Sequence, residues 1–455
     1  MRLTVGEIAK IVGGRLLQGD PAQTVEHVSF DSRSMLGRDL FIPIRGEKVD
    51  GHRFIAGAMA AGAAASLTAE AEAEVPGPLI LVKDTVLGLQ RLASHLRREF
   101  EGPVVGITGS VGKTTTREMT MAALRAAGPV TGSLKNQNSQ LGLPTTVCHM
   151  DYSAWAAVLE MGVSEPDEME RLVQVARPEL ALVTNIGVAH IQNLGSREGI
   201  CREKMRITEH LGEKGTAVLC GDEPLLRAYQ DKLLARTLYF GMDQKSDVYP
   251  ENLMSEGLPA FTAVLKKSVL GETLKIPVRL SVPGSHNVMN ALAALTAAAV
   301  LGVDPEKAAE SLEGFTGFAR RLEQAEVGGL RLIDDSYNAS PVSMKAALEV
   351  LAAAPGSRRV ALLADMLELG PDSRSMHREV GEFAADLPID LYITLGEEIK
   401  ALEGPLTEAG KTVMHAATRE EAVTLIKAMT DPGDVLLLKG SNGMRLDLVR
   451  AALAD

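Results

Sequence analysis

Residues 104–116, VVGITGSVGKTTT, have the composition of a loop that binds phosphate. Gly109 and Gly112 would let the backbone approach a phosphate closely, because glycine has no side chain. Lys113 supplies a mobile cation, and Thr114 offers a hydroxyl to a magnesium ion that bridges phosphates. The segment therefore contains the groups needed to bind a nucleotide.

The loop departs from the strict fingerprint, which requires glycine five residues before Gly112, where this chain has Ile107. The surrounding sequence still favours a phosphate loop. The apolar run PVVGIT predicts a buried strand before it, and a helix is predicted to begin near Lys113. Backbone amides and the helix dipole would then converge on an anion. We predict a nucleoside triphosphate as the ligand; the alternative is a glycine-rich turn with a solvated lysine.

Two polar residues follow other apolar runs, at positions where an open α/β sheet binds its ligands. Glu160 ends the run WAAVLE, and His190 follows LALVTNIGVA. A carboxylate and an imidazole near phosphates indicate magnesium ligation; the alternatives are a helix cap for Glu160 and a hydrogen-bonded loop histidine for His190. Lys204 lies in the helical stretch REGICREKMRI, where a bare ammonium would repel magnesium. From the residues alone, Lys204 is a solvated surface lysine.

The elements that must position these residues fall into three predicted domains. Residues 1–84 contain short strand patterns, glycine turns and an Ala/Gly-rich helix from about Ile55, which indicate a small α/β domain. Residues 85–315 alternate apolar strands with helical patterns, as in a doubly wound, mostly parallel sheet, and include a predicted buried helix at 291–303. The alternation starts again over residues 316–455, which predicts a third, Rossmann-like α/β domain.

Composition limits the classes of function. A chain of 455 residues exceeds one hydrophobic core, and 45% hydrophobic with 23% charged residues is typical of a folded protein. The net charge of -12 argues against nucleic acid or an anionic membrane as the main partner. We find no signal-peptide pattern and no apolar run of the ~18 residues that a membrane span needs. Cys148, Cys201 and Cys220 lack metal-ligand spacing, so we expect reduced thiols in a cytoplasmic chain.

Six motifs occur in the order found in the Mur ligases: TGSVGKTTT, LEMG, TNIGVAH, PGSHNVMNALAAL, RRLE and DDSYNASPVSMKAAL. The chain therefore resembles this family over nearly its whole length. The family uses the shorter phosphate loop Thr-Gly-x-x-Gly-Lys-Thr/Ser, which accounts for Ile107. Within the family, DDSYNASPVSM and the N-terminal DSRSMLGRDLFIPIRGEKVDGHRFI resemble the members that add D-alanyl-D-alanine to UDP-N-acetylmuramoyl-tripeptide. The Asp-Asn-Pro-Arg motif usual in members that add meso-diaminopimelate or lysine is absent.

The resemblance implies a role for each matching residue. Lys113 would contact the β- and γ-phosphates of ATP. Thr114 and Glu160 would hold one Mg2+, and His190 with a carbamylated Lys204 would hold a second. The implied ATP-binding residues are Gly109, Ser110, Gly112, Lys113, Thr114, Thr115, His286, Asn287, Arg321 and Asp335. Of these, His286 and Asn287 would lie on the adenine side. The implied substrate-binding residues are Ser32, Arg33 and Gly46 for the UDP-sugar, Asn136 and Asn138, and Tyr337 and Asn338 for the dipeptide. For the loop residues among these, simple turn formation is the alternative.

The implied reaction is ATP-driven formation of a peptide bond. A carboxylate is a poor electrophile, and the sequence offers no obvious acyl-enzyme nucleophile, so the tripeptide carboxylate must first be activated as an acyl phosphate. The dipeptide amine would then displace phosphate, while closure of the third domain excludes water. ADP and phosphate are the expected by-products. We expect a monomer.

Two segments depart from the family pattern. In NQNSQLGLP, residues 136–144, Ser139 and Gln140 stand where relatives commonly have an amide and an acid, which bears on tripeptide binding. In EKMRI, Arg206 replaces an acid close to Lys204, which bears on the metal site. Two alternatives stay open. One is another ligase of the superfamily, such as a folylpolyglutamate synthase or an amino-acid-adding Mur ligase; the other is a nucleotide-switched binding protein that forms no bond.

Overall fold

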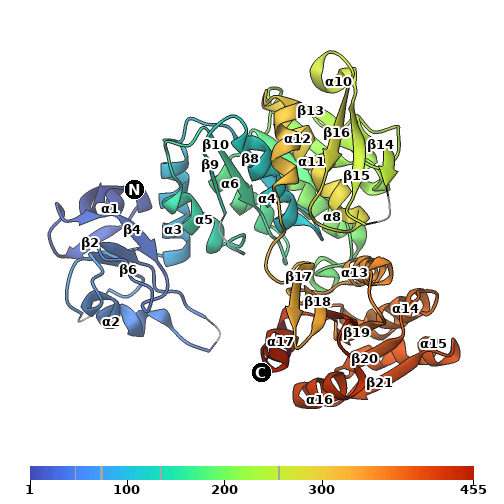
Figure 1. The fold of residues 1–455 in the computed structure, drawn as a ribbon. Coiled ribbons are helices and arrows are strands. Elements are labelled where there is room, and N and C mark those ends of the chain that lie inside the picture. Colours follow the sequence, from blue (N-terminus) through green and yellow to red (C-terminus); the bar gives the residue numbers. More distant parts are fainter. Residues whose placement is uncertain (47, 72–74, 134–135, 255–256, 455) are drawn as a thin grey trace.

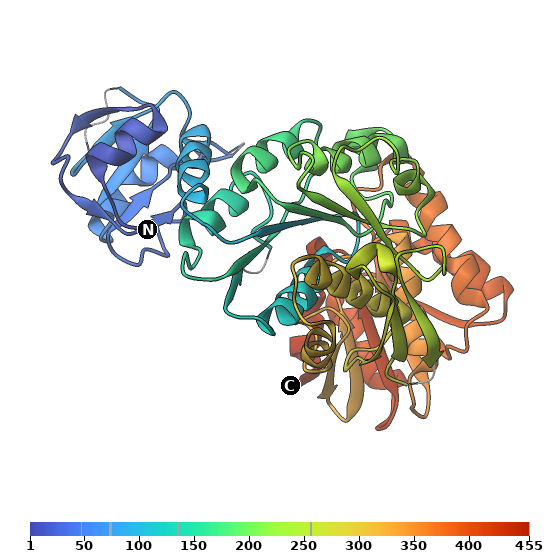
Figure 2. The ribbon, with the colours of Figure 1, turned by 90° about the horizontal axis from the view of Figure 1, so that it is seen from above.

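The computed structural model describes residues 1–46, 48–71, 75–133, 136–254 and 257–454. Three large β-sheets, each covered by helices, form the centres of three domains (Figure 1). The N-terminal domain lies at one end of the molecule, and the third domain packs beside the middle domain (Figure 2). Within the described residues, no helix is both long enough and apolar enough to cross a lipid bilayer.

The N-terminal domain is a small α/β domain, as predicted. Its elements are β1 (Leu3–Thr4), α1 (Val5–Val12), β2 (Arg15–Gln18), β3 (Thr24–Val25), β4 (His27–Ser29), β5 (Asp39–Phe41), α2 (Ile55–Ala60), β6 (Ala65–Thr68) and β7 (Leu79–Leu81). The main sheet has the strand order β2-β7-β6-β5-β4, and β1 pairs separately with β3. Helix α3 (Thr85–Arg97) follows, and the Asp84 carboxylate caps it by accepting a hydrogen bond from the Leu87 amide. Because α3 packs against both α1 and α5 (Gly142–His149), it joins the first domain to the second.

The middle domain contains a nine-stranded sheet. Its strands are β8 (Val104–Thr108), β9 (Val130–Gly132), β10 (Ala156–Glu160), β11 (Leu180–Val183), β12 (Thr216–Cys220), β13 (Arg236–Phe240), β14 (Val248–Met254), β15 (Ala260–Leu265) and β16 (Leu274–Arg279). The order is β16-β15-β14-β13-β12-β11-β8-β10-β9. The pairs from β9 to β14 are parallel, whereas β15 and β16 add an antiparallel edge that we did not predict.

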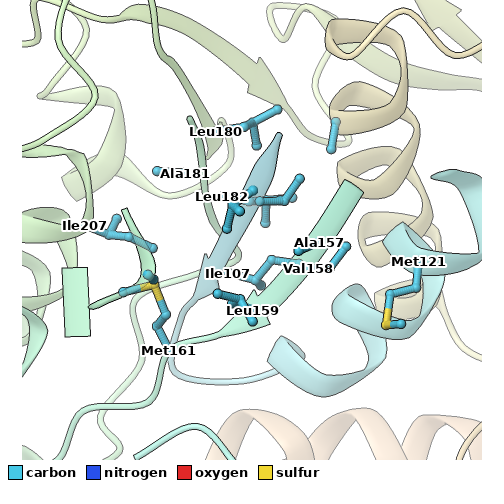
Figure 3. Close-up of a cluster of buried hydrophobic side chains, with 14 of the residues drawn as sticks. Ile107, Met121, Ala157, Val158, Leu159, Met161, Leu180, Ala181, Leu182 and Ile207 are labelled. Carbon is cyan, nitrogen blue, oxygen red and sulfur yellow. The ribbon is translucent and has the colours of Figure 1, made fainter. Parts of the chain in front are cut away.

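The central strands of this sheet are apolar along their whole length because helices cover both faces. Figure 3 shows Ile107, Val158 and Leu182 from β8, β10 and β11 in one buried cluster. Ile107 has no exposed surface. The residue that breaks the strict phosphate-loop fingerprint is therefore a core residue of β8, and the loop itself begins later.

The helices of the middle domain connect successive strands. They are α4 (Lys113–Arg125), α5, α6 (Glu168–Ala176), α7 (Ile191–Leu194), α8 (Arg197–Met205), α9 (Pro224–Arg227), α10 (Lys267–Leu270), α11 (Ser285–Val300) and α12 (Pro305–Glu313). The predicted buried helix is α11, which packs against α4 and is buried along most of its length. It therefore supports the helix that follows the phosphate loop.

The third domain has a six-stranded sheet with the order β17-β18-β22-β19-β20-β21. Its elements are β17 (Glu323–Val327), β18 (Leu330–Asp335), α13 (Pro341–Ala353), β19 (Arg359–Ala364), α14 (Ser373–Ala385), β20 (Leu391–Leu395), α15 (Glu403–Glu408), β21 (Thr412–Ala416), α16 (Arg419–Met429), β22 (Val435–Lys439) and α17 (Leu446–Ala454). All pairs except β17 with β18 are parallel. The predicted α/β class, with a mostly parallel central sheet and a Rossmann-like third domain, is confirmed.

Candidate active site

The predicted phosphate loop lies between β8 and α4. Gly109 has a φ of +148°, and a Cβ atom there would be 1.9 Å from the hydroxyl oxygen of Thr184. Gly112, with a φ of +82°, comes directly before the first residue of α4. The unpaired amides of the first turn of α4 thus lie at the loop, where they and the helix dipole favour an anion.

The loop is held by residues that follow the neighbouring strand β11. The Val111 amide donates to Oδ1 of Asn185 (2.9 Å), and the Val111 carbonyl accepts from the Thr184 hydroxyl (2.7 Å) and from Nδ2 of Asn185 (2.9 Å). The Ser110 hydroxyl accepts from the Gly187 amide (2.8 Å). Ser110 and Val111, in the middle of the loop, are therefore held by hydrogen bonds to the segment 184–187.

A cavity of about 680 Å3 lies against this loop and is lined by residues of the middle and third domains. Its size is typical of a small-molecule site. The predicted site residues that line it are Ser110, Gly112, Lys113, Thr114, Thr115, Asn138, Glu160, His190, His286, Asn287, Arg321, Asp335, Tyr337 and Asn338. The fold thus brings most of the predicted nucleotide residues to one cavity.

Lys113 is the cation of the loop. Its ammonium donates to the carbonyls of Gly109 (2.8 Å) and Ser110 (3.4 Å). Burial lowers the pKa of Lys113, an effect that Glu160 opposes and Arg321 reinforces. A phosphate in the cavity would offer this ammonium a charged acceptor in place of two neutral carbonyls, and such bonds are stronger.

Glu160 lies at the end of β10 and is 1% exposed. Its carboxylate accepts from Nδ2 of Asn138 (2.7 Å) and from the Thr114 hydroxyl (3.0 Å), and it forms an ion pair with Arg117 (3.2 Å). The oxygens of Thr114 and Glu160 are hard donors of the kind that Mg2+ prefers, and both residues line the cavity. This donor set fits a magnesium ion, and the helix-cap alternative for Glu160 does not apply.

His190 comes directly before α7 and has a φ of +63°. Its Nδ1 lies 3.2 Å from a carboxylate oxygen of Glu368, a residue of the third domain. Burial lowers the pKa of His190, and Glu368 opposes this shift. The imidazole therefore lies at the boundary between the two domains and lines the cavity.

Lys204 lies in α8 and is 1% exposed, so it is not the surface lysine that the sequence alone suggested. Its ammonium has no hydrogen bond or ion pair with any residue that the structure describes. Burial lowers the pKa of Lys204 well below its usual value, and the nearby Lys113 lowers it further, against the influence of Glu203 and Glu168. The surroundings favour a neutral amine at this position.

The third domain contributes Arg321 to the phosphate loop. The Arg321 guanidinium donates to the Thr114 hydroxyl (3.1 Å) and lies over the ring of Tyr337, 4.2 Å from its centroid. The Arg321 bond to Thr114 thus brings the two domains into contact across the cavity. On the middle-domain side, burial lowers the pKa of His286, which keeps its ring neutral.

Six predicted residues do not line the cavity. Three of them are in the middle domain. Gly109 begins the phosphate loop, and Lys204 is buried in α8. Asn136 is exposed and does not line the cavity, although Asn138 does. Ser32, Arg33 and Gly46 belong to the N-terminal domain, which lies at one end of the molecule (Figure 2), whereas the phosphate loop belongs to the middle domain. The Arg33 side chain is 87% exposed and paired with Asp31. In this arrangement the predicted UDP-sugar residues and the nucleotide cavity form separate surfaces.

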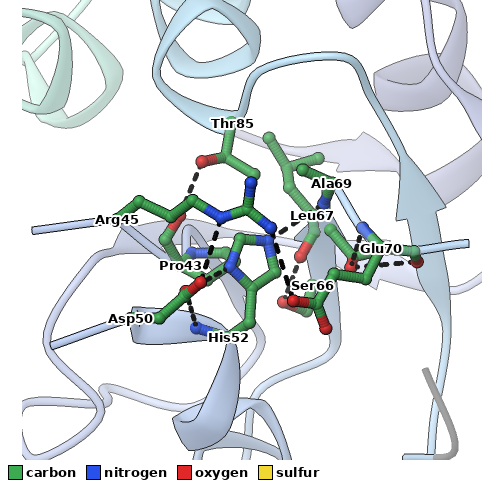
Figure 4. A network of polar contacts seen from close by, with 10 residues as sticks. Pro43, Arg45, Asp50, His52, Ser66, Leu67, Ala69, Glu70 and Thr85 are labelled. Carbon is green, nitrogen blue, oxygen red and sulfur yellow. Dashed lines mark hydrogen bonds and ion pairs between the residues drawn. The ribbon is translucent and has the colours of Figure 1, made fainter.

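A polar network joins Arg45, the neighbour of Gly46, to Asp50, His52 and Glu70 (Figure 4). His52 is buried; its Nδ1 lies 2.6 Å from Asp50 and its Nε2 accepts from the Ala69 amide (3.0 Å). Asp50, His52 and Glu70 are close enough together to hold a metal ion. However, the Arg45 guanidinium already pairs with both carboxylates, at 3.0 and 3.4 Å, so the network is a structural one.

The two departures from the family pattern have structural roles. The Gln140 side chain donates to the Glu168 carbonyl (2.9 Å) and accepts from the Gln90 side chain (3.1 Å), so it ties α3 to the start of α6. Arg206 pairs with Asp167 (2.6 Å) and Glu170 (2.5 Å) and does not bond to the Lys204 amine. Arg206 therefore balances neighbouring acids.

Sequence reasoning missed five residues that support the cavity: Arg117, Thr184, Asn185, Asn290 and Lys439. The side-chain oxygen of Asn290 accepts from the Thr116 hydroxyl (3.0 Å), and its amide donates to Asn287 (3.0 Å), one helical turn earlier. The spacing of the two asparagines in PGSHNVMN was an available signal for Asn290. Arg117 and Lys439 gave none, because an isolated basic residue in a sequence looks solvated.

Comparison with known proteins gives matches along nearly the whole chain. The models of three Mur ligase domains match residues 24–97 (Mur ligase family, catalytic domain), 107–298 (Mur ligase middle domain) and 320–442 (Mur ligase, glutamate ligase domain). A relative from Bacillus subtilis (strain 168), named UDP-N-acetylmuramoyl-tripeptide--D-alanyl-D-alanine ligase, is 39% identical over 98% of this chain and 97% of its own length. The chain belongs to the Mur ligase family. The resemblance inferred from the six motifs is confirmed.

Solved structures agree with this assignment. The chain superposes on MurF from Acinetobacter baumannii with a TM-score of 0.91 at 28% identity, covering 100% of this chain and 99% of the other. MurF ligase from Thermotoga maritima, solved in complex with ADP, matches with a TM-score of 0.82 at 28% identity, covering 94% and 97%. This Mur ligase therefore has the three-domain architecture of its family along its full length.

Proposed function

We propose that this Mur ligase joins D-alanyl-D-alanine to the terminal carboxylate of UDP-N-acetylmuramoyl-tripeptide in peptidoglycan precursor synthesis, converting ATP to ADP and phosphate. The observation that carries the proposal is the full-length match to the Bacillus subtilis ligase of that name, at 39% identity. The cavity supports it, because it combines a phosphate loop with residues of a second domain that can close on a substrate.

Activation of the carboxylate is the first step of the proposed reaction. A tripeptide carboxylate oxygen attacks the γ-phosphorus of ATP, the bond from that phosphorus to the β,γ-bridging oxygen breaks, and ADP leaves. Lys113 and the amides at the start of α4 bind the phosphates, and Arg321 adds positive charge from the third domain. Mg2+ held by Thr114 and Glu160, and by His190 with a carbamylated Lys204, would neutralise phosphate charge when bound.

Peptide-bond formation is the second step. The dipeptide amine attacks the acyl carbon, a tetrahedral intermediate forms, and phosphate leaves as the amine loses a proton. Asn138, Tyr337 and Asn338 line the cavity where the two substrates must meet, so we assign them to substrate contacts. Contact between the middle and third domains would exclude water, which would otherwise hydrolyse the acyl phosphate.

The modification of Lys204 is a separate part of the proposal. A charged ammonium that is buried without a partner is costly, and a neutral amine can add carbon dioxide and release one proton to form a carbamate anion with two oxygen donors. The change replaces a cation that repels metal with a ligand that attracts it. Exposure to 13C-labelled carbon dioxide should give a carbamate resonance in the protein that disappears in Lys204→Ala.

Activity measurements give a second readout for Lys204. Lys204→Ala should lose most of its activity and regain part of it when short carboxylates are added, because they can replace the carbamate oxygens. Lys214→Ala, at an exposed position in the same domain, is the matched control and should behave as wild type. An unlabelled Lys204 together with a fully active alanine variant would contradict the carbamate.

We place the enzyme in the cytoplasm as a monomer. ATP is the proposed co-substrate, and the three cysteines are buried and unpaired, as expected in a reducing compartment. Sedimentation at enzyme concentrations used for assay tests the oligomeric state directly.

The deciding experiment is incubation with ATP, UDP-N-acetylmuramoyl-tripeptide and one amine at a time. We expect ADP, phosphate and a new amide with D-alanyl-D-alanine, with tripeptides ending in either diaminopimelate or lysine tested in parallel. Turnover only with glutamate or a single amino acid would indicate another ligase of the superfamily. Hydrolysis of ATP without amide formation under all conditions would indicate a nucleotide-switched binding protein.

A further inference from the structure

A buried lysine of the third domain contacts two of the predicted site residues. Lys439 is the last residue of β22 and is 2% exposed. Its ammonium lies 2.5 Å from a carboxylate oxygen of Asp335 and donates to the carbonyl of Asn338 (2.7 Å). Lys439 and Asp335 are register partners in the parallel strands β22 and β18, so the C-terminal ends of these two strands lie side by side.

The other oxygen of Asp335 bonds to the segment that enters the third domain. It accepts a hydrogen bond from the Leu322 amide (3.2 Å). Leu322 and Arg320 have φ values of +51° and +60°. Residues with side chains rarely adopt this left-handed conformation and keep it only where surrounding bonds hold it. The bond from Leu322 to Asp335 is one of these bonds.

Arg321 lies between these two residues and is the third domain's contact with the phosphate loop. Its guanidinium donates to the Thr114 hydroxyl (3.1 Å) and lies over the ring of Tyr337, 4.2 Å from its centroid. A continuous series of contacts therefore leads from Lys439 through Asp335 and the Leu322 backbone to Arg321.

We propose that Lys439 is a positioning residue that holds Asp335 and, through it, the turn at 320–322, so that Arg321 reaches the phosphate loop. The physical reason is the low exposure of the pair. The Asp335 side chain is only 14% exposed, and a carboxylate with so little access to water that loses its cation is destabilised and must take up a proton or move toward water. Either change weakens the acceptor of the Leu322 amide. As far as it concerns ATP, this inference rests on the proposed function.

Hydrogen exchange of the free enzyme tests the structural part without any ligand. Lys439→Met keeps the length of the side chain and removes its charge. We expect exchange of the amides at 320–323 and 335–339 to accelerate about tenfold, with the rest of the chain unchanged. Lys427→Met, at an exposed position of α16 in the same domain, is the matched control and should exchange as wild type.

Three further variants keep the test informative if Lys439→Met is poorly folded. Asp335→Asn removes the same ion pair from the other side and should accelerate exchange in the same two segments. Lys439→Arg retains the charge and should restore most of the protection. In the double variant Lys439→Met/Asp335→Asn, the effects should be less than additive, because both changes remove one interaction.

Nucleotide binding tests the consequence for the site. In Lys439→Met, the dissociation constant for ADP should rise about tenfold, whereas the KM for UDP-N-acetylmuramoyl-tripeptide should change less than about twofold, since its UDP end is assigned to another domain. Unchanged exchange at 320–323, or acceleration spread over the whole third domain, would overturn the inference. Failure of the wild-type enzyme to bind ADP would overturn the proposed function instead, and the exchange data would still decide the role of Lys439.

Discussion

Substitution of Gly109 by alanine tests the phosphate loop at its tightest point. The added Cβ would be 1.9 Å from the Thr184 hydroxyl oxygen and 3.2 Å from the Asn185 amide nitrogen, at a φ of +148°. The unfavourable backbone conformation costs about 1–3 kcal/mol, and the steric overlap about 1–3 kcal/mol more. Moving the hydroxyl also breaks its bond to the Val111 carbonyl, which is worth about 1 kcal/mol. Together these terms predict a loss of about 3–7 kcal/mol in the free energy of unfolding of the middle domain.

Denaturant unfolding followed by tryptophan fluorescence measures this loss. The chain has one tryptophan, Trp155, and it lies in the middle domain, so its signal reports on that domain. Gly195→Ala is the matched control, because Gly195 has a φ of +81° but open space around its Cβ position. It should cost only the backbone term, about 1–2 kcal/mol.

The same two variants separate stability from function. Gly109→Ala should raise the KM for ATP and lower kcat, because the backbone amides of the loop are displaced from the phosphates, whereas Gly195→Ala should leave KM for ATP unchanged. If the two variants lose the same stability and both keep normal ATP kinetics, the close contact between Gly109 and Thr184 does not define the loop and the reasoning is refuted.

Three further substitutions address charge in the cavity and the departure at residue 140. Lys113→Ala should lower kcat/KM for ATP, and the lost transition-state stabilisation should be on the order of 3 kcal/mol or more. Near-normal turnover of this variant would contradict the assignment of residues 109–114 as a phosphate loop. Glu160→Ala should shift the Mg2+ requirement upward as well as slow the reaction; an unchanged titration would count against its role as a ligand. Gln140→Glu should lose the bond to the Glu168 carbonyl, lower stability by about 1–2 kcal/mol and alter tripeptide KM more than ATP KM. Unchanged Michaelis constants would limit Gln140 to a scaffold role.

The local sequence predicted individual strands and helices correctly where the apolar pattern of a single element identifies it. The alternation of apolar runs with helical patterns predicted the strands β8, β10, β11 and β12 and the buried helix α11, because burial on both faces demands uninterrupted apolar residues. The antiparallel edge formed by β15 and β16 was missed: β16 alternates buried with exposed residues, and the apolar run of β15 does not by itself reveal the direction of its pairing. The N-terminal substrate residues were named from motif resemblance, and the structure leaves them on a separate surface.

The sequence by itself determined the phosphate loop, because its function depends on neighbours along the chain: glycines that allow unusual backbone angles, a lysine, and the free amides of a helix start. Tertiary structure alone decided the charge environment of the cavity. Lys204 looked solvated and is buried, Glu160 is paired with Arg117, and Arg321 reaches Thr114 across 207 residues of sequence. Desolvation and ion pairing depend on distances between residues that are remote in the chain, so the order of residues alone does not specify them.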